Sequence, residues 1–267
     1  LMRRFAIPRS GQLCFLVLYF SSAIYLFWNR AFLMETLALC LTLLALDLYT
    51  RLRFSPGADL PFGRFWMLIL GFGACLMLAL LVKVTTALPT LILLAVDLGW
   101  QSARAIRSGR AHVAACLRWL VPVVLMIALA MLCLKAWTGH ADAVKLMNPF
   151  GFRITSTYLQ PWNFGTWPQR WSSDLWSKVV LGRMLTGLGA LPALVLLWLG
   201  LRDARQGIQR LFVLACLALT LLPLLVFTNL HIVHAYYQEA NQIYLLLALA
   251  AAFGLIVDAS RWPWRSW

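Results

Sequence analysis

The chain of 267 residues is 62% hydrophobic, with a mean hydropathy of +0.80 and a formal net charge of +14 at pH 7. A soluble domain is about half apolar, whereas this chain repeats apolar runs of about 15–20 residues, which are long enough to cross a bilayer as helices. These values exclude an ordinary soluble domain, and the lack of short alternating segments excludes a small outer-membrane barrel. Because the arginines lie between the apolar runs, the charge does not indicate a nucleic-acid-binding protein.

The apolar runs predict an all-α, polytopic integral membrane protein with about eight transmembrane helices. In chain order the expected spans are 12–28, 31–50, 65–82, 86–100, 118–137, 180–200, 210–228 and 239–257. The fourth span is short, and Pro89 suits its first turn, where no N–H is needed. Residues 1–267 are interpreted as a single transmembrane domain. The six cysteines are scattered without metal-type spacing and are expected to be small buried hydrophobes.

Basic residues predict the orientation, because Lys and Arg collect in cytoplasmic loops near the ends of spans. With a cytoplasmic N-terminus, 15 of the 23 basic residues fall inside: Arg3, Arg4, Arg9, Arg51, Arg53, Arg64, Arg104, Arg107, Arg110, Arg118, Arg202, Arg205, Arg210, Arg261 and Arg265. We therefore expect both termini in the cytoplasm, in a bacterial cell inner membrane. The inside loops contain no clustered histidine or carboxylate, so any chemistry is expected on the outer face.

Residues 138–179 are expected to form a long periplasmic loop. Within it Trp167, Trp171, Leu175 and Val179 recur every four residues, which is the spacing of one helix face. This predicts an amphipathic helix lying in the membrane interface, where tryptophan is common. Stacking of these tryptophans against a sugar ring or a lipid is the functional alternative.

Arg30 and Glu35 fall at the outer end of the first predicted hairpin. They are interpreted either as an ion pair that closes the hairpin or as groups that face a cavity, since carboxylates within membrane spans are candidate functional residues. In the second case Glu35 binds a metal, a phosphate-bound cation or a sugar hydroxyl.

Lys83 is followed by Thr85 and Thr86 just before a predicted helix start. A lysine, two hydroxyls and free backbone N–H groups form a plausible anion site, and a lipid phosphate is the anion expected at the bilayer surface. The alternative is a lysine whose ammonium simply reaches the membrane boundary.

The segment 229–239 lies between two apolar runs and contains His231, His234, Tyr236, Tyr237 and Gln238. Tyrosines are ordinary at membrane interfaces. The histidines are candidates for metal ligation, proton transfer or donation to a phosphate.

Asp47 and Asp97 sit at inner ends of predicted spans. They are expected to be solvated or paired with neighbouring arginines.

The order of three stretches resembles the GT-C superfamily of membrane glycosyltransferases, which contains protein O-mannosyltransferases and the lipid A aminoarabinose transferase. The stretches are Trp28-Asn-Arg-Ala-Phe-Leu-Met-Glu35, Leu81-Val-Lys-Val-Thr-Thr-Ala-Leu-Pro89 and His231-Ile-Val-His-Ala-Tyr-Tyr-Gln238. The resemblance covers essentially the whole chain. It implies transfer of a hexosyl or pentosyl unit from a polyprenyl-phosphate-linked donor to a lipid, glycan or protein acceptor.

The resemblance also implies roles for individual residues. Lys83 contacts the donor phosphate, Glu35 shapes the polar site, and His234 with the tyrosines lines the donor or acceptor side. The full set of implied donor-binding residues is Arg30, Glu35, Lys83, His231, His234, Tyr236, Tyr237 and Gln238. Some members of the superfamily hold a divalent metal ion, for which Glu35 and His234 are the implied ligands.

The chain departs from this family at two points. The family's catalytic carboxylate lies in the first outer loop, so the general base is expected upstream of Leu1, and the chain is interpreted as the C-terminal portion of a larger fold. Ala235 stands where an aspartate is usual in an H-D-Y-Y-like stretch, which puts that contact in doubt.

Other classes remain open from the sequence. A multi-span transporter or lipid flippase is expected to carry charged groups at the membrane midplane, whereas Glu35, Lys83 and His234 fall at span ends. A lipid-linked oligosaccharide ligase or polymerase is kept open by Arg153, Arg170 and His140 in the long loop.

Overall fold

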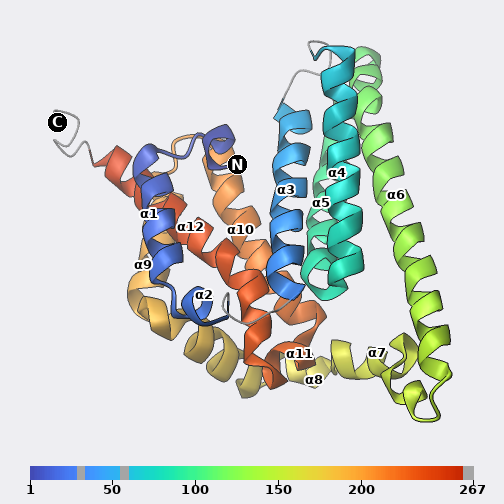
Figure 1. Ribbon diagram of the computed structural model, residues 1–267. Coiled ribbons are helices and arrows are strands. Elements are labelled where there is room, and N and C mark those ends of the chain that lie inside the picture. The colour runs from blue at the N-terminus through green and yellow to red at the C-terminus, as the bar shows by residue number, and fades with distance from the viewer. Residues whose placement is uncertain (29–33, 55–59, 261–267) are drawn as a thin grey trace. The chain divides into compact units, whose positions relative to one another are not determined.

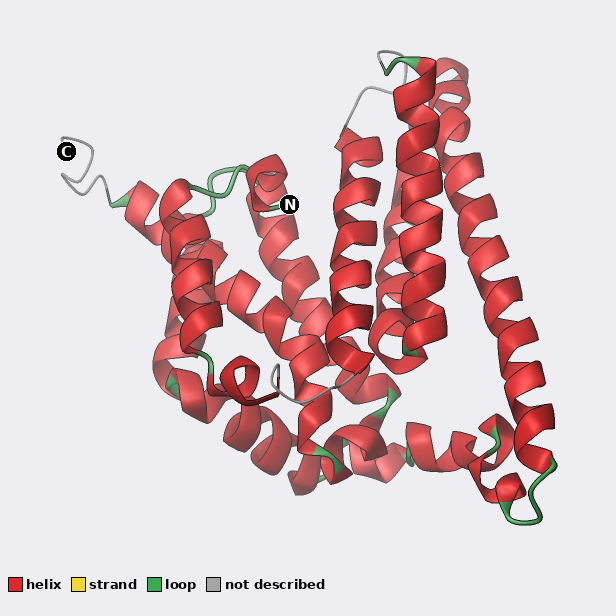
Figure 2. Cartoon of the chain, in the orientation of Figure 1, coloured by secondary structure: helices red, strands yellow, loops and turns green. Residues whose placement is uncertain are grey.

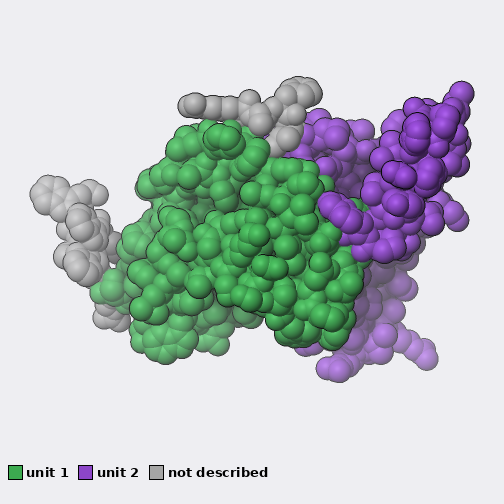
Figure 3. Space-filling view, turned by 90° about the horizontal axis from the view of Figure 1, so that it is seen from below, with its two compact units in different colours: residues 1–33, 163–267 green, residues 34–162 purple. Residues whose placement is uncertain are grey.

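The computed structural model describes residues 1–28, 34–54 and 60–260, and every regular element within these ranges is a helix (Figures 1 and 2). The chain divides into two compact units, shown in Figure 3. Unit 1 comprises residues 1–33 and 163–267, and unit 2 comprises residues 34–162. Unit 2 is thus inserted in the sequence of unit 1.

Unit 2 contains four long helices that run up and down. They are α3 (Met34–Phe54), α4 (Phe62–Val82), α5 (Val84–Ser108) and α6 (Arg110–Leu146). Its remaining elements are the 3₁₀ turn η2 (Gly151–Ile154) and most of α7 (Ser156–Phe164). Helix α4 packs against the other three long helices, and its Ile69, Phe72 and Leu76 are fully buried. Burial of these side chains supplies the main attraction that holds helices of unit 2 together.

Unit 1 is built around α12 (Gln238–Ala259), which packs against α1 (Arg9–Ser21), α9 (Ala190–Asp203) and α10 (Gly207–Val226). Its shorter elements are η1 (Met2–Phe5), α2 (Ala23–Trp28), α8 (Trp167–Arg170), the π-helix η3 (Asp174–Leu185), η4 (Thr186–Leu188), α11 (Thr228–Val233) and η5 (Ala235–Tyr237).

Helices α1 and α12 approach closely because glycines face one another. A Cβ placed on Gly254 would lie 2.7 Å from Gly11 Cα, and one on Gly11 would lie 2.7 Å from the carbonyl oxygen of Ala250. Small residues allow membrane helices to approach until their backbones touch, which increases van der Waals contact.

Five described helices are long and apolar enough to cross a membrane, or six if one bent pair counts as a single span. They are α4, α5, α6, α10 and the segment Ala235–Ala259, and the bent pair is Trp167–Leu188 with Ala190–Asp203. These helices indicate a multi-pass membrane protein, whereas the sequence predicts about eight spans.

The difference has local causes. The predicted span 12–28 is interrupted at Ser22, whose extended backbone separates the short helices α1 and α2. Helix α3 is long enough but carries Glu35, Asp47, Arg51 and Arg53. The predicted span 180–200 is bent by 81° at Gly189, whose φ of 72° favours glycine.

Two other boundaries change. The predicted short span 86–100 is the 25-residue helix α5, in which Pro89 lies inside the helix instead of opening it. The loop predicted to begin at residue 138 begins after α6, which continues to Leu146. At about 1.5 Å per residue, α6 exceeds the roughly 30 Å hydrocarbon core.

The predicted amphipathic helix is broken. Trp167 and Trp171 are 68% and 64% exposed, but Leu175 and Val179 are fully buried and belong to the separate π-helix η3. Between the two elements, the hydroxyl of Ser172 accepts the N–H of Leu175.

Candidate functional site

Lys83 and Glu35 form an ion pair at one end of unit 2. The Nζ of Lys83 lies 2.9 Å from Oε1 of Glu35, and the glutamate side chain is only 2% exposed. Glu35 sits in the first turn of α3, where a carboxylate interacts favourably with the helix dipole. The sequence predicts that both residues belong to one site, and the structure brings them into direct contact.

The backbone at Lys83 fixes this position. Lys83 is the single residue between α4 and α5, with an extended conformation (φ −155°, ψ 95°). Its N–H donates to the carbonyl of Ala79, and its own carbonyl accepts the N–H groups of Thr86 and Ala87. The end of one helix and the start of the next therefore hold the lysine at the ion pair.

Two hydroxyls lie next to the lysine in the chain. The side-chain oxygens of Thr85 and Thr86 are buried, and no described group makes a hydrogen bond with them. A buried hydroxyl normally has a partner, and leaving one without costs about 1–3 kcal/mol. An ammonium group and two hydroxyls beside a helix start form a set of donors suited to a phosphate.

His231 lies in unit 1 at the end of α11 and is 2% exposed. The guanidinium of Arg183, on the π-helix η3, donates to the carbonyls of His231 (2.8 Å) and Ile232 (3.2 Å). Burial, followed by the charge of Arg183, lowers the pKa of His231 to about 3. The imidazole is therefore neutral near pH 7, so it does not serve as a cationic phosphate ligand.

Gln238 is fully buried and holds the end of α11. Its Nε2 donates to the carbonyl of His231 at 3.1 Å and lies 3.4 Å from Nδ1 of the same histidine. Gln238 thus connects the first turn of α12 to α11, which fixes the turn that carries His234.

Aromatic rings gather around this turn. Tyr236 and Tyr237 stack with ring centroids 4.6 Å apart, and Tyr236 also lies 5.2 Å from His234 and 6.0 Å from Trp28. His234 and Tyr236 are half-buried, whereas Tyr237 is buried. The partly exposed rings offer flat apolar faces of the kind that stack on sugars or lipids.

Sequence reasoning missed the polar groups that support this turn. Asn241 donates to the carbonyl of Thr220, Gln242 donates to the carbonyl of Met184, and the hydroxyl of Tyr25 donates to the carbonyl of Glu239. The spacing of Gln238, Asn241 and Gln242 is i, i+3 and i+4, which places them on one helix face and was visible in the sequence.

The predicted site residues fall into two sets. Glu35 and Lys83 belong to unit 2, and His231, His234, Tyr236, Tyr237 and Gln238 belong to unit 1. Arg30 lies outside the described residues. Within residues 1–28, 34–54 and 60–260, no group of three or more His, Cys, Asp and Glu side chains is placed to hold a metal ion. The metal at Glu35 and His234 stays a prediction, and no step proposed below uses it.

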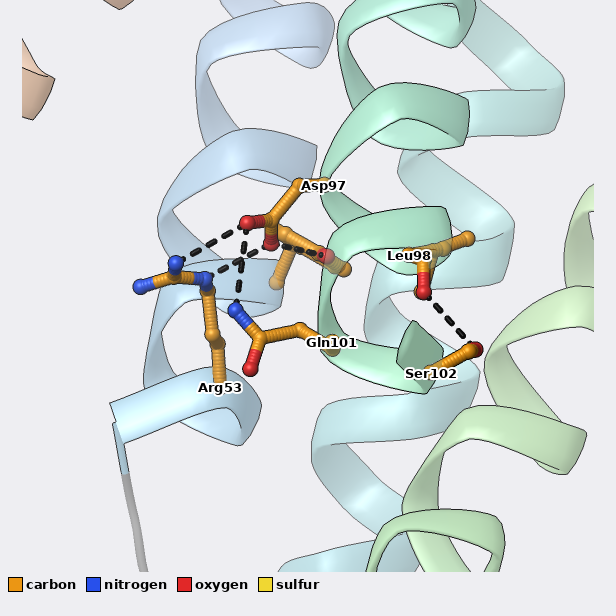
Figure 4. Close-up of polar contacts among 6 residues, drawn as sticks. Arg53, Asp97, Leu98, Gln101 and Ser102 are labelled. Atoms are coloured by element: carbon orange, nitrogen blue, oxygen red, sulfur yellow. Dashed lines mark hydrogen bonds and ion pairs between the residues drawn. The ribbon is translucent and has the colours of Figure 1, made fainter. Parts of the chain in front are cut away.

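The opposite end of unit 2 carries a different polar cluster (Figure 4). Asp97 on α5 accepts two hydrogen bonds from Arg53 on α3, at 2.6 and 2.9 Å, and one from the hydroxyl of Tyr49 at 2.6 Å. Gln101 adds a longer contact of 3.3 Å. Arg51 pairs with Asp47 at 2.8 Å. Of the two alternatives expected for these aspartates, solvation or pairing with neighbouring arginines, the structure shows pairing.

Comparison with protein-family models, curated proteins and solved structures finds no match for this chain. The functional interpretation therefore rests on the residues and their geometry.

Proposed function

We propose that this protein is a glycosyltransferase of the GT-C type, which transfers a hexosyl or pentosyl unit from a polyprenyl-phosphate-linked donor on the outer face of the membrane. The observation that carries the proposal is the Lys83–Glu35 ion pair. It lies at the end of unit 2 opposite the arginine-rich end, where the positive-inside rule expects the outer face. In a multi-pass membrane protein, a side chain at this end can contact the phosphate of a lipid-linked donor.

The proposed role of Lys83 is to bind the donor phosphate and stabilise its charge as it leaves. An ammonium group has three N–H donors, so Lys83 can contact a phosphate oxygen while it stays paired with Glu35. Glu35 holds the ammonium in place, and the Thr85 and Thr86 hydroxyls are close in sequence to donate to the same phosphate. Fixed donors of this kind stabilise developing negative charge most strongly where water is scarce.

The proposed reaction is an inverting displacement at the anomeric carbon. The acceptor oxygen forms a bond to that carbon, the bond from carbon to the phosphate oxygen breaks, and the lipid phosphate leaves. The acceptor proton passes to a carboxylate, which the family resemblance assigns to a position before Leu1. In unit 1, the rings of His234 and Tyr236 are proposed to stack against the sugar or the acceptor.

The test measures lipid binding, which does not depend on the general base. The purified chain in detergent is titrated with a polyprenyl phosphate and with the matching polyprenol, and bound lipid is measured by native mass spectrometry. We expect the phosphate to bind more tightly, and Lys83→Gln to weaken its binding by about tenfold or more, because hydrogen bonds to charged groups contribute about 1.5–3 kcal/mol.

Two controls make the result decisive. Lys135→Gln removes the same charge from α6 in the same unit and is expected to leave binding unchanged. Glu35→Gln/Lys83→Gln removes both charges, so the fold is not burdened with a lone buried carboxylate, and it is also expected to lose binding. Equal binding of the phosphate and the alcohol, or unchanged binding in both Lys83 variants, would overturn the proposal.

A further inference from the structure

Seven of the eight arginines of unit 2 lie at the end remote from Lys83, and the eighth is Arg153 on η2. Helices α3 and α5 end there, and helices α4 and α6 begin there (Figure 1). Seven arginines lie on these helix ends: Arg51, Arg53, Arg64, Arg104, Arg107, Arg110 and Arg118. The carboxylates of the described residues near this end are Asp47 and Asp97, so the described side chains there carry seven positive and two negative charges, a balance of +5.

Five of these arginines have no hydrogen-bond or ion-pair partner among the described residues. Arg53 forms an ion pair with Asp97, and Arg51 forms one with Asp47. The others are exposed, and none makes a hydrogen bond or an ion pair within the described parts of the chain; they are Arg64, Arg104, Arg107, Arg110 and Arg118. No carboxylate occurs in the sequence between Asp97 and Asp142, so α5 and α6 cannot neutralise them locally.

All basic residues at this end are arginines, which make up 19 of the 23 basic residues of the chain, and the four lysines (Lys83, Lys135, Lys145 and Lys178) lie elsewhere. A guanidinium offers paired N–H donors in a plane that matches two phosphate oxygens, whereas an ammonium acts as a point charge.

The same helix ends also expose large apolar side chains. Phe62, Trp66 and Trp100 are 81%, 37% and 62% exposed, and they lie within a few residues of Arg64 and Arg104. Helices α4, α5 and α6 are candidate membrane spans, so their ends lie at the boundary between lipid and water. Aromatic rings beside arginines at this depth fit lipid headgroups better than nucleic acid or an acidic protein.

We propose that the arginine end of unit 2 is a binding site for anionic phospholipids, with Arg104, Arg107 and Arg110 at the α5–α6 turn contacting the headgroup phosphate. The site is distinct from the Lys83 site, because these residues lie at the opposite ends of the same helices. It would be present whether or not the protein is a glycosyltransferase.

The experiment uses the purified full chain in detergent and adds dioleoyl phosphatidylglycerol or dioleoyl phosphatidylcholine. Retained lipid is counted by native mass spectrometry. We expect preferential retention of phosphatidylglycerol, and Arg104→Gln/Arg107→Gln is expected to weaken it by about tenfold or more, since each basic residue near a membrane surface contributes on the order of 1 kcal/mol. Glycerol phosphate serves as a competitor that carries the headgroup without the acyl chains.

Two variants separate a dedicated site from general charge. Arg205→Gln/Arg210→Gln removes two exposed arginines from unit 1 and is expected to change retention little. Arg104→Lys/Arg107→Lys keeps the charge but loses the paired donors, and we expect retention about threefold weaker. The proposal fails if the unit 1 pair has the same effect as Arg104→Gln/Arg107→Gln, if the lysine variant binds like the parent, or if glycerol phosphate or an RNA oligonucleotide displaces the lipid completely.

Discussion

Lys83 Nζ lies 2.9 Å from Glu35 Oε1. Lys83, the single residue between α4 and α5, therefore forms an ion pair with the first turn of α3. Removing one partner leaves the other charged in a poorly solvated place. We expect Glu35→Gln to destabilise the protein by about 3 kcal/mol, the low end of the range for breaking a buried pair, because Lys83 is 20% exposed.

A double variant supplies the control. Glu35→Gln/Lys83→Met removes both charges and is expected to recover most of the stability that Glu35→Gln loses. Melting temperatures of both variants in one detergent measure the difference. A double variant as unstable as Glu35→Gln would mean that the pair itself is not what stabilises this end of unit 2.

The α1–α12 contact predicts opposite effects for two glycine substitutions. Gly254→Ala places a methyl group 2.7 Å from Gly11 Cα and is expected to cost about 1–3 kcal/mol, because a backbone has to move. Gly99→Ala in α5 meets nothing within 4 Å and is expected to stabilise by about 0.5–1 kcal/mol through helix propensity. Thermal unfolding of the two variants measures both changes. A Gly254→Ala variant more stable than the parent protein would contradict the close approach of α1 and α12.

Burial of His231 predicts a pH dependence of stability. Its pKa is about 3 in the folded protein and 6.5 when unperturbed, so between these values the unfolded chain binds a proton that the folded chain refuses. The contribution of His231 to the stability is therefore fully present above about pH 6.5. It falls as the pH decreases towards 3, by roughly 1 kcal/mol per pH unit.

Melting temperatures between pH 7.5 and 4.5 test this dependence. His231→Gln is expected to flatten the decline, while His112→Gln, which changes an exposed histidine, is expected to leave its slope unchanged. An equal slope in the parent protein and in His231→Gln would show that the imidazole is not held neutral.

The Asp97 cluster predicts a contrast between two aspartates on neighbouring helices. Asp97→Asn weakens contacts that join α3 to α5, and we expect a loss of about 2–3 kcal/mol, because hydrogen bonds between charged groups are strong. Asp47→Asn removes a pair within α3 and is expected to cost only about 0.3–0.5 kcal/mol. Similar losses for both would indicate that the contact between helices contributes little.

The sequence was sufficient for the helical membrane class, and for Asp47 and Asp97 it left solvation or pairing with arginines as the two alternatives. Hydropathy averages over a window, so it did not detect the break at Ser22, which depends on the backbone of one residue. The period of four residues from Trp167 to Val179 was real, but α8 ends at Arg170 and the π-helix η3 begins at Asp174 within it.

Only part of the candidate site was predictable from the sequence. Lys83 and Glu35 were identifiable because charged residues are rare beside apolar runs, and their contact follows from neighbouring helix ends. Arg183 was not identifiable, because its role depends on two carbonyls about 50 positions later that only the fold brings near. Tyr25, which donates to the carbonyl of Glu239, was hidden in the same way.

The insertion of unit 2 between the two segments of unit 1 has a consequence for biosynthesis. Gly11 and Gly254 touch in the finished protein, but the ribosome makes one long before the other. At about 5–20 residues per second, α1 waits roughly 10–50 s for α12. During that time unit 2 can complete its helix packing, while η1 and α2 are the only described helices of unit 1 that accompany α1. The assembly of unit 1 is therefore a late event, and until α12 has been made α1 depends on the lipid or on an insertion factor to shield it.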